Sequence, residues 1–515
     1  MIYSQNYHCV METHKSEVSM DFKIDVKAET THFPHYWEHC IGSCHAVMGL
    51  RADWQAQLKK VKDELGFKYV RFHGLFDDDM SICFKPSLFS SGDVTYSFHN
   101  VDLLFDFLLS INIKPFIEIG FMPTILASGT ATCFHYKGNV TPPANYEAWS
   151  ALVKAFVSHL ADRYGIDEIR TWFFEVWNEP NLNYFWKGDK QEYMKLYQST
   201  AFAVKSVDTQ LPVGGPATSV NAWIPDIINF CKETNTPLDF ISTHHYPSDD
   251  PLWAEGGMNF DVPDLSKMTD EEKAAAVQKA KEYFGSLQNR AYPRGVLTEM
   301  AIKAKEQASG YPLYYTEWNA ATRHDEPYAA CLVAKTLVDN QGLVEGYSYW
   351  TFSDLFEEAG QSSVPFHNGF GLMNIHGIPK PTYRLFELFH NLGDQRLPVY
   401  SNTTHPTIEM IAIKKGDGLT CIVYNQNTPS GEISSDEVTL TFENLQSKQA
   451  VLLRIDEDNA NARKTWEDMG SPMYPTSEQL TRSHEASTPS REIIDISNGI
   501  ITFTLKPHAI VAIII

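Results

Sequence analysis

Two glutamates that lie far apart in the chain stand in similar surroundings, and their side chains could act as a catalytic pair. Glu179 falls in the run 174–180 and Glu317 in the run 314–319, and each follows a short β-rich segment. Cleavage of a glycosidic bond with retention needs two carboxyl groups about 5–5.5 Å apart, one to protonate the leaving oxygen and one to attack the anomeric carbon. A single glutamate at a strand end is as often a surface carboxylate, so the prediction depends on the pair. It assigns Glu179 as the acid/base and Glu317 as the nucleophile.

The two carboxyl groups need different protonation states, and their proximity would supply the difference. Like charges this close oppose a second ionisation, so an ionised Glu317 would keep Glu179 protonated and ready to donate. Once a glycosyl-enzyme forms on Glu317, that charge is neutralised and Glu179 can act as a base toward water. Asn178, in the same Asn-Glu-Pro turn, is placed to hydrogen-bond the sugar 2-hydroxyl.

Other polar and aromatic residues stand at expected strand ends. We expect His73 and His244 to hydrogen-bond sugar hydroxyls, whereas His245, the next residue, should point the other way. Trp350 is either a stacking floor for the sugar or a core residue. The acidic run at 77–79 could form a metal site with histidines, but it lies beyond a strand and the first strand lacks a His-x-His pair. We therefore expect no metal in the site.

These residues need a scaffold that brings strand ends together, and the alternation of elements predicts one. From about residue 38 to 392, short β-rich runs alternate with longer amphipathic stretches, which is typical of parallel βαβ units. The predicted strands are 40–43, 69–73, 114–121, 171–177, 211–214, 239–244, 313–317 and 346–351. The predicted helices are 54–65, 101–109, 146–164, 193–207, 223–231, 271–287, 328–340 and 381–392.

Eight strands, each followed by a helix, predict an α/β fold closed into a (β/α)₈ TIM barrel, whose catalytic residues sit at the carboxyl ends of the strands. A doubly wound open sheet is the alternative. It is disfavoured because no glycine-rich phosphate-binding motif follows the first strand. Strands four and seven lie on different sides of a barrel mouth, so Glu179 and Glu317 could face each other across a sugar.

The pattern changes after about residue 395, where no long helical periodicity returns. Antiparallel strands are predicted at 407–414, 419–425, 437–442, 449–455 and 500–505. We expect an accessory antiparallel β-sandwich domain at 393–515 after the catalytic barrel at 38–392. The N-terminal segment 1–37 contains an alternating run at 18–27, which predicts a half-buried strand that joins the sandwich. The apolar end, Ile513-Ile514-Ile515, should be paired and covered because it would favour aggregation if exposed.

Composition restricts the partner and the compartment. The chain has 515 residues, and 64 acidic against 42 basic residues give a formal net charge of −22. Such a surface repels polyanions such as nucleic acid and suits a neutral oligosaccharide better than a uronic-acid sugar. The eight cysteines are scattered, which favours reduced thiols, and we find no signal-peptide core or membrane span. These features predict a cytoplasmic protein without a membrane or nucleic-acid partner.

Several motifs along the chain carry a family resemblance. They are Arg71-Phe72-His73-Gly74, the runs 116–123 and 138–143, Trp177-Asn178-Glu179-Pro180, Gly214-Gly215-Pro216-Ala217, Thr316-Glu317-Trp318-Asn319, the run 349–354, Gly369-Phe370-Gly371-Leu372 and Met469-Gly470-Ser471-Pro472. On these motifs the chain resembles glycoside hydrolase family 39, whose best-known members are β-xylosidases. The resemblance covers nearly the whole chain.

The resemblance implies a retaining, exo-acting enzyme with a barrel and an accessory β-sandwich, no cofactor and often a homo-oligomeric state. By motif it implies the same acid/base, Glu179, and the same nucleophile, Glu317, as the residues themselves indicate. Asn178, His73, His244 and the Glu357-Glu358 pair match positions that resemble sugar-contacting residues in the family, and which of the two glutamates contacts the sugar stays open. The full set of predicted substrate-binding residues is Asn178, His73, His244, Tyr246, Phe121, Trp350, Glu357 and Glu358.

The chain also departs from the family pattern, and the departures bear on substrate preference. After strand six it has Ser242-Thr243-His244-His245 where Ser-Arg-His is expected, and a longer, acidic segment spans 247–311. A loop on the catalytic face of a barrel shapes the substrate pocket. We expect an exo-acting β-xylosidase, with an arabinosidase, a β-glucosidase or an α-L-iduronidase-like enzyme as alternatives. The alternative from another class is a catalytically silent carbohydrate-binding protein, which the presence of both glutamates disfavours.

Overall fold

Eight parallel strands close into a barrel at the centre of the larger part of the molecule. The computed structural model describes residues 20–86, 94–249, 269, 271–275, 278 and 292–515. The barrel strands are β3 (Cys40–His45), β4 (Tyr69–His73), β7 (Lys114–Ile119), β10 (Phe173–Val176), β11 (Val213–Thr218), β12 (Phe240–His244), β13 (Leu313–Trp318) and β14 (Gly346–Tyr349). The pair Tyr349 and Ile41 closes the ring between β14 and β3. The predicted TIM barrel is confirmed.

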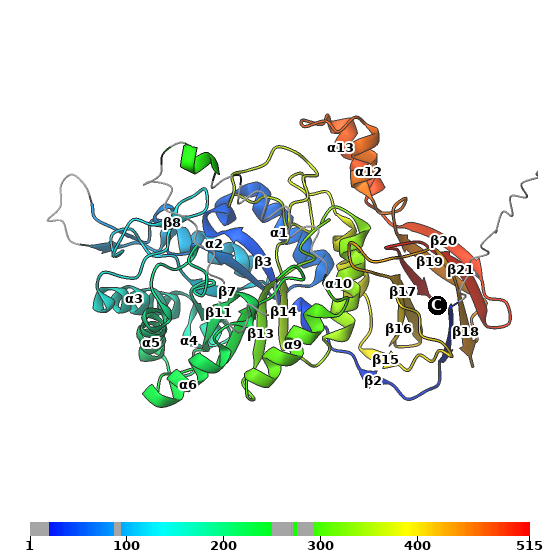
Figure 1. Ribbon diagram of the computed structural model, residues 1–515, viewed down its shortest axis with the longest axis horizontal. Coiled ribbons are helices and arrows are strands. Elements are labelled where there is room, and N and C mark those ends of the chain that lie inside the picture. Colours follow the sequence, from blue (N-terminus) through cyan, green and yellow to red (C-terminus); the bar gives the residue numbers. More distant parts are fainter. Residues whose placement is uncertain (1–19, 87–93, 250–268, 270, 276–277, 279–291) are drawn as a thin grey trace, which may run out of the picture.

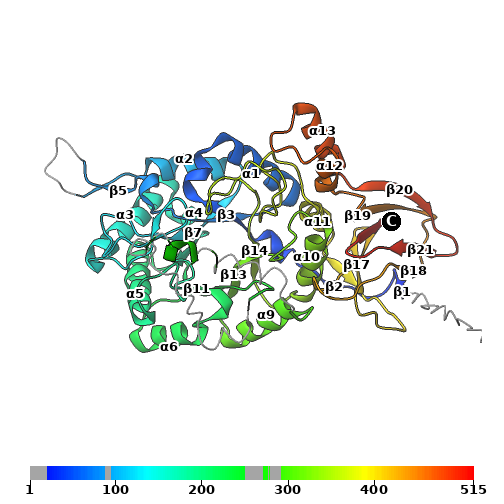
Figure 2. The same ribbon diagram turned by 45° about the horizontal axis from the view of Figure 1, so that its top comes forward.

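Helices cover the outside of the barrel (Figures 1 and 2). They are α1 (Ala52–Leu65), α2 (His99–Ser110), α3 (Tyr146–Tyr164), the short α4 (Ile166–Ile169), α5 (Lys190–Val207), α6 (Ile224–Thr234), α9 (Val296–Gln307), α10 (Pro327–Asp339) and α11 (Pro381–His390). In α1 the buried residues Trp54, Leu58, Val61 and Leu65 recur at helical spacing. Among the described residues, no helix is long and apolar enough to cross a membrane.

The helix that precedes β13 differs from the prediction. The sequence pattern predicts a helix at 271–287, of which residues 271–275 are helical and most of the rest lies outside the described residues. The structure has α9 (Val296–Gln307) directly before β13, and its residues Val296, Leu297, Met300, Ala301 and Ala304 are buried. The sequence analysis did not predict α9, because the more strongly charged run at 271–287 has a similar helical period and was assigned as the helix before β13. Most of the acidic segment 247–311 outside α9 likewise lies outside the described residues.

The barrel interior is layered, and the layers follow from the two-residue repeat of a strand. Phe116, Phe173, Phe240 and Tyr314 come from four strands and meet inside the barrel, where the ring centroids of Phe116 and Phe173 are 4.9 Å apart and those of Phe173 and Tyr314 are 5.1 Å apart. Two residues further along β7 and β10 stand Glu118 and Glu175, which are paired across these strands. An aromatic layer therefore lies below a charged layer near the strands' carboxyl ends.

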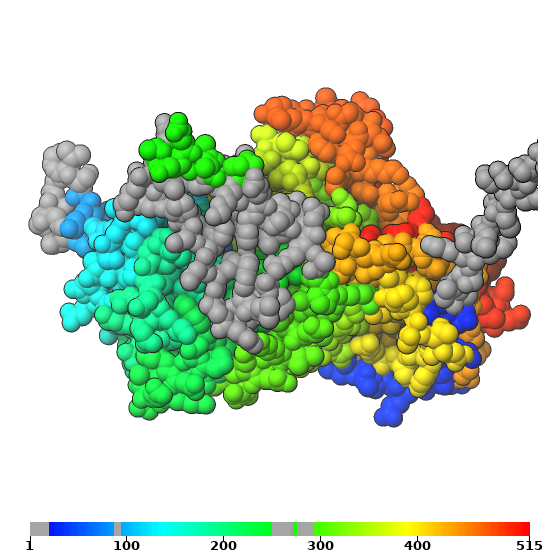
Figure 3. Space-filling view, viewed as in Figure 1, coloured from blue at the N-terminus to red at the C-terminus, as the bar shows by residue number. Residues whose placement is uncertain are grey.

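The chain after the barrel forms two sheets packed against each other. One has seven strands in the order β2 (Thr31–His32), β15 (Gln395–Leu397), β16 (Ile408–Lys415), β17 (Gly418–Asn425), β22 (Ile510–Ile514), β19 (Gln449–Ile455) and β20 (Ser490–Asp495). The other has β1 (Met20–Asp25), β18 (Asp436–Glu443) and β21 (Ile500–Leu505). Figure 3 shows N-terminal residues, in blue, against this C-terminal part. The predicted accessory β-sandwich is confirmed as a fold class.

The N-terminal strand lies in the smaller sheet of the sandwich. β1 pairs with β18 in parallel, and its alternate residues Met20, Phe22 and Ile24 are buried while Asp21 and Lys23 are exposed. Residues 18 and 19 of the predicted strand lie outside the described residues. At the other terminus, β22 is paired on both sides by β17 and β19. Ile513 is fully buried there, whereas Ile514 remains 39% exposed.

Two short helices, which the sequence analysis did not predict, interrupt the sandwich. α12 (Ala462–Asp468) and α13 (Ser477–Ala486) follow β19 and form the orange protrusion at the top of Figure 1. Both are short and begin at side-chain caps, Asn461 and the capping box of Thr476 with Gln479. Because α13 buries only one residue, Ser483, it carries no apolar stripe for a pattern search to find. The edge strand β20 was missed for the same reason, since its side chains are mostly exposed.

The sandwich is joined to the barrel by apolar contacts and by charges. Ile411, Ile413, Ile422 and Tyr424 of the large sheet belong to the same buried cluster as the barrel helices. Glu409 on β16 accepts from both Arg294, at 2.6 Å, and Lys335 of α10, at 3.1 Å. The two parts therefore share a packed interface.

We predict that Leu440→Ala destabilises the sandwich by about 2–5 kcal/mol, because Leu440 is fully buried between β1 and β21 and its loss leaves a cavity. Urea unfolding followed by circular dichroism measures the change. Glu437→Ala, at an exposed position of the same strand, is the matched control and should change stability by less than about 0.5 kcal/mol. Equal losses in the two variants would contradict the assigned core.

Candidate active site

The two glutamates predicted as a pair meet at the mouth of the barrel. Glu179 follows β10, and Glu317 lies at the end of β13. One carboxylate oxygen of Glu179, one of Glu317 and a ring nitrogen of His244 all lie within 4.8 Å of one another. This spacing fits the carboxyl separation of about 5–5.5 Å that retaining glycoside cleavage needs. The two glutamates lie 138 positions apart in the numbering, and the barrel closes that separation to one sugar-sized gap.

A tight turn after β10 presents Glu179 to the mouth. Trp177 and Glu179 both have left-handed backbone conformations, with φ of 71° and 43°. The turn is held because Trp177 N donates to Ile119 O at 3.2 Å and Glu179 N donates to Ala217 O at 2.8 Å. Non-glycine residues in this region carry a conformational cost, which the neighbouring strands β7 and β11 offset through these bonds. The result is that two consecutive residues, Asn178 and Glu179, both contribute to the site.

The guanidinium of Arg71 is the centre of charge in the site. It is fully buried and donates to Glu175 at 2.5 Å, to Glu317 Oε1 at 2.7 Å and to Asn178 Oδ1 at 3.0 Å, with Glu118 at 2.9 Å. The hydroxyl of Tyr246 donates to the other oxygen of Glu317, Oε2, at 2.8 Å. Both oxygens of Glu317 are thus held by donors, and one donor carries a full positive charge.

Glu179 has the surroundings of a proton donor. Burial raises its pKa to about 7, although the Arg71 charge opposes the shift. Its Oε1 lies 3.0 Å from Nδ1 of His244, which is itself fully buried. A carboxyl group with a pKa near neutrality can give up a proton and take one back within one catalytic cycle.

The remaining predicted residues form one wall of the site around His73. Nδ1 of His73 lies 2.7 Å from Glu118, and Nε2 lies 3.7 Å from both Glu317 and Glu358. The Trp350 ring centroid is 4.7 Å from that of His73, and the side chain is almost fully buried. Phe121 is completely buried, with its ring centroid 6.0 Å from that of His73. Phe121 and Trp350 therefore both pack around His73.

The structure separates the Glu357-Glu358 pair. Glu357 accepts from His45 Nδ1 at 2.8 Å. Glu358 is close to His73, and its Oε1 is buried without a hydrogen-bond partner among the described residues. Burial raises the pKa of Glu358 well above its ordinary value, and the charges of Glu317, Glu179 and Glu118 raise it further. Glu358 is therefore the member of the pair that lies beside His73 and close to the charges of Glu317 and Glu179.

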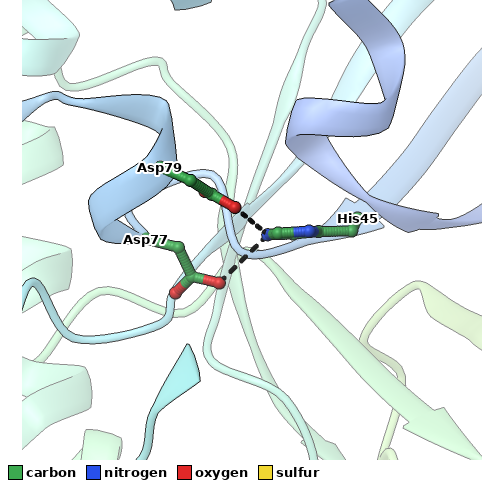
Figure 4. Close-up of side chains that lie close together, drawn as sticks. All are labelled: His45, Asp77 and Asp79. Atoms are coloured by element: carbon green, nitrogen blue, oxygen red, sulfur yellow. Dashed lines mark hydrogen bonds and ion pairs between the residues drawn. The ribbon is translucent and has the colours of Figure 1, made fainter. Parts of the chain in front are cut away.

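His45 contacts acidic side chains close to the site, among them Asp77 and Asp79 (Figure 4). Its Nε2 lies 3.2 Å from Asp77 and 3.6 Å from Asp79, while Nδ1 contacts Glu357. Burial favours the neutral ring, but the hydrogen bonds to Asp77 and Glu357 outweigh it and raise the pKa of His45 to about 9. The side chains of His45, Asp77 and Asp79 are of types that can bind a metal ion, as are those of Glu179, His244 and Glu317. The charged imidazole itself balances the carboxylates around it.

Several site residues had no assigned role in the sequence analysis. Arg71, Glu118, Glu175 and Thr316 form the charged and polar layer beneath the catalytic pair. A signal was present, because Arg71, Glu118 and Glu175 each stand two residues after an aromatic side chain that faces the barrel interior. A charge on the buried face of a strand requires a partner in the folded protein, so it marks an interior polar cluster.

Comparison with known proteins gives consistent results. The sequence pattern of the family described as "Glycosyl hydrolases family 39" matches residues 20–499. A β-xylosidase of Caldicellulosiruptor saccharolyticus is 46% identical over 493 residues, covering 93% of this chain and 95% of the relative. A β-xylosidase of Geobacillus stearothermophilus is 38% identical, covering 86% and 84% of the two chains. The solved structure of a β-xylosidase from Caulobacter crescentus superposes with a TM-score of 0.78 at 31% identity, covering 96% of this chain and all of the other.

We predict that His45 makes stability depend on pH. A pKa raised from 6.5 to about 9 on folding means that the contribution is complete below about pH 6.5 and is lost as the pH rises through about 9. His45→Gln should be less stable than the wild type at pH 6.5, and the difference should shrink above pH 9. Urea unfolding at several pH values measures this, with the exposed His32→Gln as control. Parallel pH curves for the wild type and His45→Gln would contradict the assigned charge.

Proposed function

The chain belongs to glycosyl hydrolase family 39, and from this premise we propose that it is a retaining exo-β-xylosidase that releases xylose from the non-reducing end of xylo-oligosaccharides. The observation that carries the proposal is the convergence of Glu179 and Glu317 within 4.8 Å at the barrel mouth. Two curated β-xylosidases align with this chain over at least 84% of their own length, which supports the choice of sugar.

In the first step, a carboxylate oxygen of Glu317 attacks the anomeric carbon while Glu179 gives its proton to the leaving oxygen. The bond to the leaving group breaks as the glycosyl-enzyme bond forms, so the charge of Glu317 disappears. Arg71 and Tyr246 orient the attacking carboxylate before reaction. Because Glu179 is now ionised, it can remove a proton from the incoming water in the second step, and xylose leaves with retained configuration.

The proposed sugar contacts come from the wall around His73. His73, Glu358 and Asn178 supply polar atoms beside the catalytic pair, and the neutral carboxyl of Glu358 can donate to a sugar hydroxyl. Trp350 supports this wall as an apolar surface next to His73. We assign Glu357 to His45 and not to the sugar, because its carboxylate already accepts from that ring.

The same proposal covers the setting of the enzyme. The carbohydrate substrate is neutral, and the net charge of −22 disfavours nucleic acid as a partner. Seven cysteines described in the structure are buried as free thiols, which supports a location in the cytoplasm. There the enzyme would act on products of xylan degradation. We divide the chain into a catalytic barrel at 38–392 and a β-sandwich at 393–515 completed by the N-terminal strand, and we propose a homo-oligomer on the family resemblance.

We predict that aryl β-xylosides are hydrolysed in preference to aryl glycosides of arabinose, glucose and iduronic acid. The kcat/KM for the xyloside should exceed that for the glucoside by at least about tenfold, because a pocket built for a pentose rejects the extra hydroxymethyl group. A preference for another sugar would replace the xylosidase assignment within the same family. Binding of xylobiose without turnover of any glycoside would instead indicate a carbohydrate-binding protein.

We predict different losses for the two glutamates. Glu179→Ala should slow substrates with poor leaving groups by about 10²–10⁴-fold while activated aryl xylosides react well in the first step, and added azide should restore their turnover. Glu317→Ala should abolish turnover of all substrates alike, because no glycosyl-enzyme can form. Steady-state kinetics with and without azide distinguish the two variants. A glycosyl azide of retained configuration from Glu317→Ala, together with one of inverted configuration from Glu179→Ala, would exchange the two roles.

A further inference from the structure

A chain of hydrogen bonds runs beneath the acid/base residue and ends at the buried arginine. Oε1 of Glu179 lies 3.0 Å from His244 Nδ1, and His244 Nε2 lies 3.1 Å from the Thr316 hydroxyl. That hydroxyl donates to Glu175 Oε1 at 2.8 Å, and Glu175 Oε2 accepts from Arg71 at 2.5 Å. The chain crosses four barrel strands or their ends, β10, β12, β13 and β4, and its inner members His244, Thr316 and Glu175 are buried.

The direction of each bond follows from the arginine end. Arg71 can only donate, and the Glu175 carboxylate beside it accepts at both oxygens. Thr316 has one hydroxyl hydrogen, and it is directed to Glu175. The Thr316 oxygen can then only accept from His244, which places the ring proton on Nε2. If Thr316 instead donated its hydrogen to His244 Nε2, the lone pairs of the Thr316 hydroxyl and of Glu175 Oε1 would face each other in a buried contact. Such a contact costs free energy.

The position of the proton on His244 determines whether Glu179 keeps its own proton. Burial lowers the pKa of His244, so the ring is neutral and carries a single proton. With that proton on Nε2, Nδ1 is a bare acceptor 3.0 Å from Glu179. We propose that Thr316 and Glu175 are positioning residues that fix the tautomer of His244 and thereby hold the catalytic proton on Glu179, an inference that rests on the proposed acid/base function.

The same geometry serves both steps of the reaction. In the first step, Glu179 passes its proton to the leaving oxygen and faces the Nδ1 lone pair as a carboxylate. That contact is repulsive, so it strengthens Glu179 as a base toward the proton of the incoming water. Glu179 loses one proton and regains one, while His244 keeps its single proton throughout, and the proton balance of the cycle closes.

Other groups around Glu179 and His244 also act on this proton. Nδ1 of His244 lies 3.7 Å from Glu317 Oε2, which already accepts from Tyr246. The ionisable groups that face Glu179 and His244 are Arg71 and His73 of β4, Glu118 of β7, Glu175 of β10, Glu317 of β13, Tyr246 after β12 and Glu358 after β14. A substitution at Thr316 leaves all of them in place, so a change in the proton affinity of Glu179 can be assigned to the hydrogen-bond chain.

The test is the pH dependence of kcat/KM for xylobiose, whose poor leaving group requires the proton of Glu179. Thr316→Val removes the hydroxyl, so His244 can carry its proton on Nδ1 and donate to ionised Glu179. This stabilises the ionised form, and the alkaline limb should move to lower pH by about one unit, a tenfold loss of proton affinity. Thr316→Ser keeps the hydroxyl, so its alkaline limb should lie at the wild-type pH. Thr336→Val, which removes a buried hydroxyl that donates to Leu332 O of its own helix at 2.8 Å, should not move the alkaline limb.

A second measurement does not need turnover or a folded variant of Thr316. In wild-type enzyme labelled with ¹⁵N-histidine, with the His244 signals identified by their loss in His244→Gln, the neutral ring should carry its proton on Nε2. A proton on Nδ1, or an alkaline limb that is the same in Thr316→Val and wild type, would overturn the proposal. Failure of the proposed function is distinguishable, because the wild type itself would then not hydrolyse xylobiose.

Discussion

One positive charge, the guanidinium of Arg71, holds the polar interior of the barrel together. A buried guanidinium is tolerated only where carboxylates and hydrogen-bond acceptors surround it, and here three glutamates and an asparagine do so at 2.5–3.0 Å. The acceptors come from β7, β10, β13 and the turn after β10. Because one side chain contacts all of them, the relative positions of these strands and the orientation of the Glu317 carboxylate are set together. Removal of this charge would leave several buried carboxylates without compensation.

The aromatic layer beneath Arg71 makes these interactions strong. Phe116, Phe173, Phe240 and Tyr314 fill the lower barrel and exclude water from that side. In such surroundings charges are weakly screened, and the cost of ionising a carboxyl group rises. Glu179 and Glu118 respond with pKa values raised to about 7 and about 8, in both cases with burial as the largest cause. The same packing that stabilises the barrel therefore also raises the proton affinity of Glu179 at its mouth.

Much of the fold was predictable because it depends on local patterns. The eight barrel strands are β-rich runs that alternate with longer amphipathic stretches. β1 shows an alternation that is retained in the structure as buried Met20, Phe22 and Ile24. Elements without an apolar stripe were not found: α12, α13 and the exposed edge strand β20 are stabilised by caps, pairing and small contacts such as that of Trp466 with Phe366. Helix α9 was not predicted, because the sequence analysis assigned a single helix, 271–287, to the segment before β13.

For the site, the sequence alone determined which residue types were available and on which strands they stood. The contexts of Glu179 and Glu317 identified a candidate pair because a barrel must bring its strand ends to one rim. Only the tertiary structure decided that the Glu358 carboxyl and not that of Glu357 faces the pair, that Arg71 contacts Glu317, and that His244 links Glu179 to Thr316. These outcomes depend on strand register and on burial, including the register shifts between β12 and β13. Such properties arise from contacts between residues distant in the chain, which no local pattern records.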